Sequence, residues 1–232
     1  MHPPPVPGAT FYFDLGSPFA YLTAERIDAV LAEPSVVPDG PGAASGEPAA
    51  PLGEPAGGFD RPAAAPARRV VWQPVSLGAL FKLAGRSSWS LGDPERRRAG
   101  IAEVQRRAVA YGLPAVRWPE PWPSNYLFAM RACTYAFAQG RGHEFTLAAF
   151  RAAFQRGHDL GVPEQVLAVA AEVSLDQHAV EAATAEPAVK DALRAATEDA
   201  HEQGVFGVPT VAVGGELFWG DDRLEQAAAV LD

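Results

Sequence analysis

The segment FYFDLGSPFAYL, residues 11–22, places a serine where two kinds of secondary structure meet. Residues 10–15 are rich in β-forming side chains, whereas apolar residues recur at helical spacing over residues 18–31. Ser17 is therefore expected at the end of a strand and the start of a helix. It either caps that helix, with Pro18 in the first turn, or hydrogen-bonds a ligand held there. From the residues alone, the cap is the simpler interpretation.

Composition argues against several other kinds of chemistry. The formal net charge is −9 and no basic stripe is present, which argues against a nucleic-acid or anionic-membrane partner. Cys133 is the single cysteine and the histidines lack metal-ligand spacing, so neither an internal disulfide nor a metal site is predicted. We expect Cys133 to be a small core residue. The chain has no apolar signal core and no apolar run of membrane length, so we expect a cytoplasmic protein.

The elements that must position Ser17 form an interrupted α/β pattern. A strand and helix at the N-terminal end are followed by a strand over 69–75 and a short helix over 77–84. Helices are then predicted over 94–111, 126–140, 144–156, 163–173, 176–184 and 187–203. Two strands, 210–213 and 216–219, and a helix from residue 222 complete the chain. This order predicts a thioredoxin fold interrupted by an all-helical insertion.

Two segments fall outside this pattern. Residues 1–9 are expected to be a flexible tail. Residues 34–68 are mostly proline, glycine and alanine without a periodic apolar face, which predicts a disordered surface loop. The loop is either a tolerated insertion or a lid. The thioredoxin-like domain then comprises residues 10–84 and 204–232, and the helical insertion domain comprises residues 85–203.

Five stretches of the chain together resemble one protein family. They are FYFDLGSPFAYL, PVSLGALFKLAG, WPSNYLFAMR, GVFGVPT and FWGDDRL, in that order. The sequence resembles the 2-hydroxychromene-2-carboxylate isomerases and kappa-class glutathione transferases, within the wider DsbA-like group. The redox Cys-x-x-Cys of related proteins is replaced here by residues 17–20, Ser-Pro-Phe-Ala, so dithiol exchange is not expected at this position. The resemblance implies instead that Ser17 is catalytic and hydrogen-bonds the sulfur of an external thiol, usually glutathione.

The resemblance also implies where that thiol is held. Val208 and Pro209 are implied as a backbone clamp for its cysteinyl part, with Pro209 in the cis form. From the dipeptide alone, an ordinary trans proline at a strand start remains an alternative. Asp222 is implied to face the ammonium of the γ-glutamyl end, and Arg223 is either part of that site or a structural partner.

Other residues are implied as contacts of the cofactor or the substrate. Lys82 is implied to complement a carboxylate of the thiol or of an aromatic substrate, and a solvated lysine is the alternative. Phe19, Asn125 and Arg131 are implied to line the substrate pocket. For Asn125 a helix cap, and for Arg131 a surface charge, are equally good interpretations.

The sequence departs from the family at two positions of the thiol site. Relatives commonly have asparagine where this chain has Arg86, and asparagine, glutamine or serine where it has Asp221. Arg86 is expected to offer a new partner to a carboxylate. Asp221 is expected to add a negative charge near the place of the γ-glutamyl carboxylate, or to point to solvent as a cap.

These expectations lead to a thiol-dependent isomerase of the 2-hydroxychromene-2-carboxylate isomerase type. Its cofactor is expected to be glutathione or another low-molecular-weight thiol, and its partners are a small aromatic substrate and a second copy of the chain. The first alternative is a kappa-class-like transferase that leaves the sulfur on its product. The second is a thioredoxin-like binding protein without chemistry.

Overall fold

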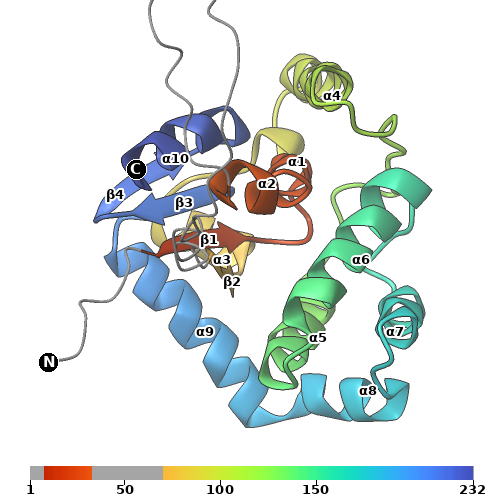
Figure 1. The fold of residues 1–232 in the computed structure, drawn as a ribbon. Helices are drawn as coiled ribbons and strands as arrows, with labels where there is room; N and C mark the ends of the chain where they lie inside the picture. Colours follow the sequence, from red (N-terminus) through yellow and green to blue (C-terminus); the bar gives the residue numbers. More distant parts are fainter. Residues whose placement is uncertain (1–7, 33–69, 232) are drawn as a thin grey trace, which may run out of the picture.

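The computed structural model describes residues 8–32 and 70–231 of the chain (Figure 1). The expected loop 34–68 and residues 1–7 of the expected tail lie outside the described residues. Ala9 is buried as the first residue of strand β1, so the expected tail of residues 1–9 is too long by this residue.

A four-stranded mixed sheet in the order β2-β1-β3-β4 forms the centre of the fold. Its strands are β1 (Ala9–Phe13), β2 (Val70–Pro74), β3 (Thr210–Val213) and β4 (Glu216–Trp219). β1 pairs with β2 in parallel and with β3 antiparallel, and β3 and β4 form a hairpin. Gly214 and Gly215 turn this hairpin with positive φ angles, which glycine adopts at little cost.

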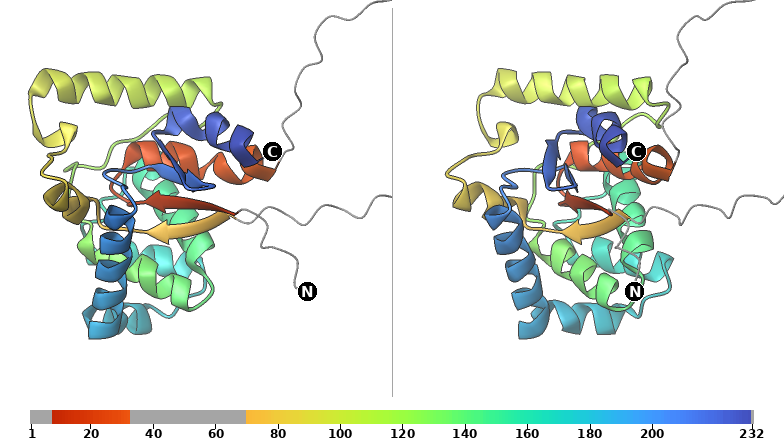
Figure 2. Two further views of the ribbon diagram at one scale, coloured as in Figure 1. Left: turned by 90° about the vertical axis from the view of Figure 1, so that its left-hand side faces the viewer. Right: turned by 60° about the vertical axis from the view of Figure 1, so that its left-hand side comes forward.

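Helices cover both faces of the sheet (Figures 1 and 2). Phe11, Phe13 and Val211 point into the larger core, which includes residues of α1 (Pro18–Ala24), α2 (Ile27–Ala32) and α10 (Leu224–Leu231). Tyr12 alternates to the opposite face and packs with Leu80 of α3 (Leu77–Leu83) and Ala200 of α9 (Pro187–Glu202). The single helix predicted over 18–31 is wrong in one respect, because the chain turns at Glu25 and Arg26 between α1 and α2.

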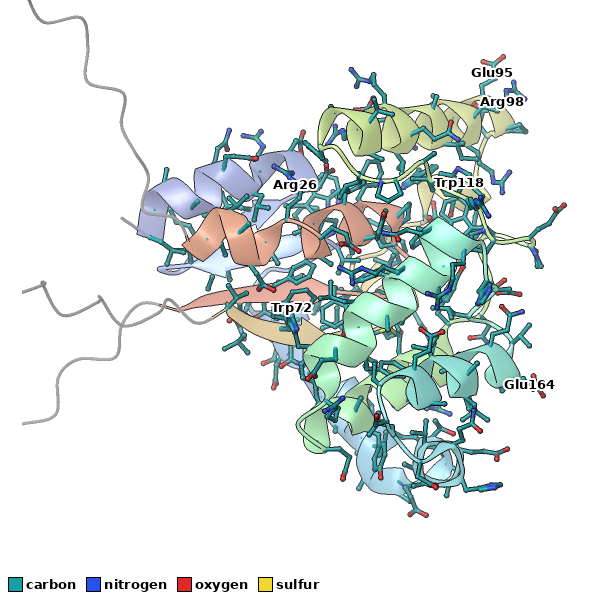
Figure 3. The ribbon with its side chains drawn as sticks, turned by 45° about the vertical axis from the view of Figure 1, so that its right-hand side comes forward. Arg26, Trp72, Glu95, Arg98, Trp118 and Glu164 are labelled. Atoms are coloured by element: carbon teal, nitrogen blue, oxygen red, sulfur yellow. The ribbon has the colours of Figure 1, made fainter. Side chains whose placement is uncertain are left out.

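The helical insertion joins the same core as the sheet. Its other helices are α4 (Pro94–Ala110), α5 (Leu127–Ala138), α6 (Gly142–Arg156), α7 (Pro163–Glu172) and α8 (Gln177–Ala185), preceded by the short 3-10 helix η1 (Trp89–Leu91). Phe13 of β1 lies 6.0 Å from Phe150 of α6 between ring centroids. On the neighbouring strand β2, the ring centroid of Trp72 (labelled in Figure 3) lies 4.6 Å from that of His143 of α6.

Cys133 is a core residue, as predicted. It is completely buried on α5, and its Sγ lies 3.4 Å from Thr146 Oγ1. Burial raises the pKa of its thiol to about 12, which keeps the sulfur protonated and unreactive at neutral pH.

Candidate functional site

A cavity of about 710 Å³ lies at the carboxyl end of β1. Parts of the chain far apart in sequence form it: the starts of α1 and α3, η1, the irregular segment 122–126, and residues 207–209 and 219–223. Such an edge, where strands end and helices begin, is a common place for ligands in α/β folds. Seven of the predicted site residues line it: Ser17, Phe19, Asn125, Val208, Pro209, Asp221 and Asp222.

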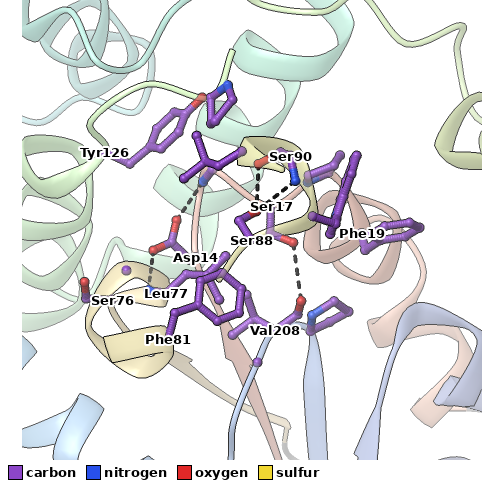
Figure 4. Close-up of a pocket in the computed structure, with 18 of the residues that line it drawn as sticks. Asp14, Ser17, Phe19, Ser76, Leu77, Phe81, Ser88, Ser90, Tyr126 and Val208 are labelled. Atoms are coloured by element: carbon purple, nitrogen blue, oxygen red, sulfur yellow. Dashed lines mark hydrogen bonds between the residues drawn. The ribbon is translucent and has the colours of Figure 1, made fainter. Parts of the chain in front are cut away.

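Ser17 is both a helix cap and a buried hydroxyl at this cavity. Its Oγ accepts a hydrogen bond from Ala20 N at 3.2 Å, and Pro18 occupies the first turn of α1. The same hydroxyl donates to the carbonyl oxygen of Val208 at 3.5 Å (Figure 4). This second hydrogen bond is long and therefore weak, so the hydroxyl proton is available to a better acceptor.

Val208 accepts the hydrogen bond from Ser17, and both Val208 and Pro209 line the cavity. The peptide bond between them is cis, as the resemblance implied. Gly220 N donates to Pro209 O at 2.9 Å, which ties this turn to the chain after β4. A Cβ atom at Gly207 would lie 2.9 Å from Trp219 Nε1, so the glycine before Val208 lets the indole approach the backbone.

Asp14 is a site residue that the sequence reasoning missed. Its two carboxylate oxygens accept hydrogen bonds from Gly16 N and Leu77 N, both at 2.8 Å. The carboxyl therefore ties the turn before Ser17 to the start of α3. Burial raises the pKa of Asp14 to about 6 from an ordinary value of 3.8. The signal was present in the sequence, because an aspartate directly follows the apolar strand.

Aromatic rings form one wall of the cavity. Phe19 lies 6.0 Å from Trp89, and Trp89 lies 5.4 Å from Trp122, between ring centroids. Trp122 Nε1 donates to Gly16 O at 3.3 Å, which fixes the indole against the turn before Ser17. Phe19 thus lines the cavity, and its contact with a substrate stays a prediction, whereas neither tryptophan was identified from the sequence. Their positions depend on η1 and on the proline-rich segment, for which periodicity gives no prediction.

Asn125 lines the cavity and contacts the start of α5 from the position before its N-cap, Tyr126. Its Oδ1 accepts a hydrogen bond from Leu127 N at 3.1 Å, as expected of a polar residue just before α5. Asn125 is therefore not the N-cap itself, and its contact with a substrate stays a prediction. Ser88 and Ser90 add polar groups that were not predicted, and their hydroxyl oxygens lie 2.7 Å apart.

Both expectations for Asp221 are wrong: it is neither a free negative charge at the cavity nor a cap that points to solvent. Asp221 is 1% exposed, and its carboxylate pairs with Arg107 Nη1 at 2.7 Å and accepts from Tyr111 Oη at 3.0 Å. It neither points to solvent nor faces the cavity with a free charge. Burial raises the pKa of this carboxyl, and the adjacent Arg107 guanidinium opposes the rise.

Asp222 and Arg223 lie beside this pair in the 3-10 helix η2 (Asp221–Arg223) and line the cavity. The Asp222 carboxylate is exposed and lies 3.5 Å from Arg107. Arg223 donates to Gln226 Oε1 at 2.7 Å, which is a structural contact. Arg107 was missed because α4 is distant from η2 in sequence.

Three predicted residues do not reach this cavity. Lys82 and Arg131 line a second cavity between α3, α5 and α9. Arg86 is exposed, with its guanidinium carbon 4.4 Å from the centroid of the Phe206 ring. Phe206 in turn packs on Trp219 at 4.9 Å, so Arg86 reaches the rim of the first cavity only through these rings. The contacts expected of Lys82, Arg86 and Arg131 are therefore not part of the Ser17 constellation.

Within residues 8–32 and 70–231, no group of three or more histidine, cysteine, aspartate or glutamate side chains is arranged to hold a metal ion. In the same part of the chain, none of the helices is both long and apolar enough to cross a membrane.

Comparison with known proteins places this geometry among thioredoxin-like folds. A family model described as a DSBA-like thioredoxin domain matches residues 9–232. The chain is 29% identical over 127 residues, 54% of its length, to a 2-hydroxychromene-2-carboxylate isomerase from Sphingobium xenophagum. It is 29% identical over 124 residues, 53% of its length, to a protein of the same name from Pseudomonas putida. These matches span 63% and 59% of the two relatives, less than two thirds of either.

Solved structures show the same fold. A 2-hydroxychromene-2-carboxylate isomerase superposes with a TM-score of 0.71 at 22% identity, covering 95% of this chain and 92% of that one. A probable DsbA oxidoreductase from Streptomyces coelicolor gives a TM-score of 0.64 at 20% identity, covering 97% and 89% of the two chains.

Proposed function

Since this chain belongs to the DSBA-like thioredoxin domain family, we propose that it is an isomerase of the 2-hydroxychromene-2-carboxylate isomerase type. We propose that its substrate is a small aromatic compound and its cofactor glutathione or another low-molecular-weight thiol. The names of two relatives support the isomerase class. The observation that carries the proposal is the Ser17 hydroxyl, weakly bound to Val208 O, in a cavity with an aromatic wall and no cysteine among its described lining residues.

The residues present fit a thiol cofactor. Ser17 would donate to its sulfur, the Val208–Pro209 backbone would lie along its cysteinyl part, and the exposed carboxylate of Asp222 would face an ammonium group. When bound, the thiol supplies a nucleophile that adds reversibly to a conjugated substrate. Phe19 and Trp89 offer ring faces and edges to an aromatic substrate and keep water from it.

Ser17 favours the ionised form of a sulfur that it contacts. Its Oγ accepts from Ala20 N and donates to Val208 O, and its hydroxyl proton would be free to turn towards the sulfur of a bound thiol. A hydrogen bond to a charged group contributes about 1.5–3 kcal/mol, which corresponds to roughly one or two pKa units. The short α1, only seven residues long, adds at most a modest dipole contribution of about 0.3–1 kcal/mol. Together these would lower the pKa of a bound thiol from its ordinary value of about 8.5 to the neutral range.

The test is Ser17→Ala with Ser76→Ala as the matched control. Both serines cap a helix that begins at this cavity, since Ser76 Oγ accepts from Ala79 N at 3.4 Å. Each variant should therefore lose about 1 kcal/mol of unfolding free energy. Only Ser17→Ala should raise the pKa of bound glutathione, measured by ultraviolet absorbance of the thiolate, and slow turnover of 2-hydroxychromene-2-carboxylate. An unchanged thiol pKa and rate in Ser17→Ala would reduce Ser17 to a cap.

Thiol consumption separates this proposal from its alternatives. An isomerase regenerates the thiol in each turnover, so glutathione concentration should stay constant while product accumulates. A kappa-class-like transferase would consume one thiol for each product molecule. Failure of calorimetric titration to detect binding of any of several cellular thiols would indicate a thioredoxin-like binding protein.

A further inference from the structure

A second cavity, of about 730 Å³, lies between α3, α5 and α9, outside the Ser17 constellation. Its described lining combines basic side chains with aliphatic ones. The basic residues are Lys82, Arg131, Lys190 and Arg194, and the aliphatic residues are Ala79, Leu83, Leu127 and Leu193. Glu198 is the one carboxylate among the described lining residues. An excess of positive charge is thus concentrated at one place in a chain whose formal net charge is −9.

The hydrogen-bond partners of these cations show which donors are open to a ligand. Lys190 Nζ donates to Ala185 O and keeps two further N–H donors, whereas Arg194 pairs with Asp191 one turn away. Arg131 Nε is buried and has no hydrogen-bond partner among the described residues. A buried N–H without an acceptor is costly, and a bound anion would supply one. An anion would also reduce the mutual repulsion of the four cations.

The aliphatic lining selects the rest of the ligand. No aromatic side chain occurs among the described lining residues, in contrast to the first cavity with Phe19, Trp89 and Trp122. The volume exceeds the need of a small inorganic anion, and the leucines offer an apolar surface to a hydrocarbon chain. We propose that this second cavity binds a small aliphatic carboxylate, with its head group at Arg131 and Lys190 and its chain against Leu127 and Leu193. This proposal does not depend on the proposed isomerase activity.

The two cavities adjoin each other. Ser76, Ala79 and Leu127 line both of them. A carboxylate in the second cavity therefore contacts side chains that also form the wall of the first. An NMR signal change at these shared residues alone would not show which cavity holds the ligand. Variants of residues that line only the second cavity are therefore needed to locate the binding site.

The test compares hexanoate with hexanamide, which has the same chain but no charge, by NMR-detected titration of the full chain. Hexanoate should bind roughly tenfold more tightly at low salt, and the ratio should shrink at high salt because screening weakens the charge interaction. Lys190→Gln and Arg131→Gln should each lower the affinity for hexanoate severalfold and leave the affinity for hexanamide unchanged. Glu198→Gln should raise the affinity for hexanoate, because it removes a carboxylate that repels the ligand. Glu198 itself is exposed.

Arg98→Gln is the matched control for charge. Arg98 lies near the outer end of α4, where its side chain is 71% exposed (Figure 3). Equal weakening by Arg98→Gln and Lys190→Gln would show a general charge effect and overturn the proposal. Equal binding of hexanoate and hexanamide would overturn it as well, as would a hexanoate affinity that Glu198→Gln leaves unchanged. Glu198→Gln keeps the test decisive if Arg131→Gln fails to fold.

Discussion

Single residues at the first cavity are held by backbone groups at helix starts. Ser17 accepts from Ala20 N in α1, and Asp14 accepts from Leu77 N in α3. Short side chains lose little conformational entropy when they are fixed in this way. The same N–H groups would otherwise be unsatisfied at the first turn of each helix. Capping and site geometry are therefore one arrangement in this protein, and the choice between a cap and a ligand contact at Ser17 is not exclusive.

Asp14 should make stability depend on pH in the mildly acidic range. Its pKa of about 6 in the fold exceeds the ordinary 3.8, so the folded state binds this proton more tightly than the unfolded state does. Its contribution to the free energy of unfolding is then fully present below about pH 4 and falls as pH rises through about 6, by about 3 kcal/mol. Urea denaturation at several pH values gives the free energy of unfolding of wild type and of Asp14→Asn. The difference between the two should change by this amount between about pH 4 and pH 6. If the free energies of unfolding of the two proteins changed in parallel over this pH range, the raised pKa of Asp14 would be contradicted.

At the scale of elements, the site depends on segments that join helices to the sheet. η1, η2 and the proline-rich segment before α5 supply Trp89, Asp222 and Trp122 to the cavity. α4 is fixed to η2 by the ion pair between Arg107 and Asp221. This contact connects the helical insertion to the chain just before α10, at the rim of the cavity.

Breaking that connection should destabilise the protein. Asp221→Asn removes the buried carboxylate from Arg107 and Tyr111. Loss of one partner from a buried ion pair costs about 3–5 kcal/mol, and we expect about 2 kcal/mol because Arg107 keeps its contact with Glu103. The control Asp222→Asn removes an exposed carboxylate from the same guanidinium and should cost less than about 1 kcal/mol. Chemical denaturation measures both, and equal losses would show that burial of Asp221 is unimportant.

At the scale of the whole molecule, the sheet and the helical insertion share one large core. Phe150 of α6 lies 6.0 Å from Phe13 of β1 and 6.3 Å from Tyr21 of α1, between ring centroids. The predicted boundary between a thioredoxin-like domain and residues 85–203 therefore separates two parts of the chain order, but both parts contribute to one apolar core. Such a core favours cooperative unfolding of both parts.

Phe150→Ala tests this cooperativity. Removal of the buried ring should cost about 3–5 kcal/mol and lower the melting temperature by roughly 10 °C. Thermal transitions followed by tryptophan fluorescence and by far-ultraviolet circular dichroism should coincide in wild type and variant. The control Val109→Ala, on an exposed side of α4, should leave the melting temperature nearly unchanged. Two separate transitions would show that the insertion unfolds as an independent domain.

The sequence by itself determined most of the elements. Strands 210–213 and 216–219 have the predicted bounds, and Ser17-Pro18 and Asp93-Pro94 mark the starts of α1 and α4. These signals act between residues a few positions apart, so a single sequence contains them. The missing Cys-x-x-Cys is likewise visible in the letters alone. The break between α1 and α2 was missed because apolar spacing continues across Glu25 and Arg26.

Only the tertiary structure decided which side chains share a cavity. It placed Arg131 and Lys82 in the second cavity and Trp122 in the first, and it gave Asp221 a partner on α4. Helical spacing indicates which residues share a face of one helix, but it does not indicate which distant element packs against that face. The charge of Asp221 was consequently expected to lie next to the ligand carboxylate, although in the fold it is paired with Arg107.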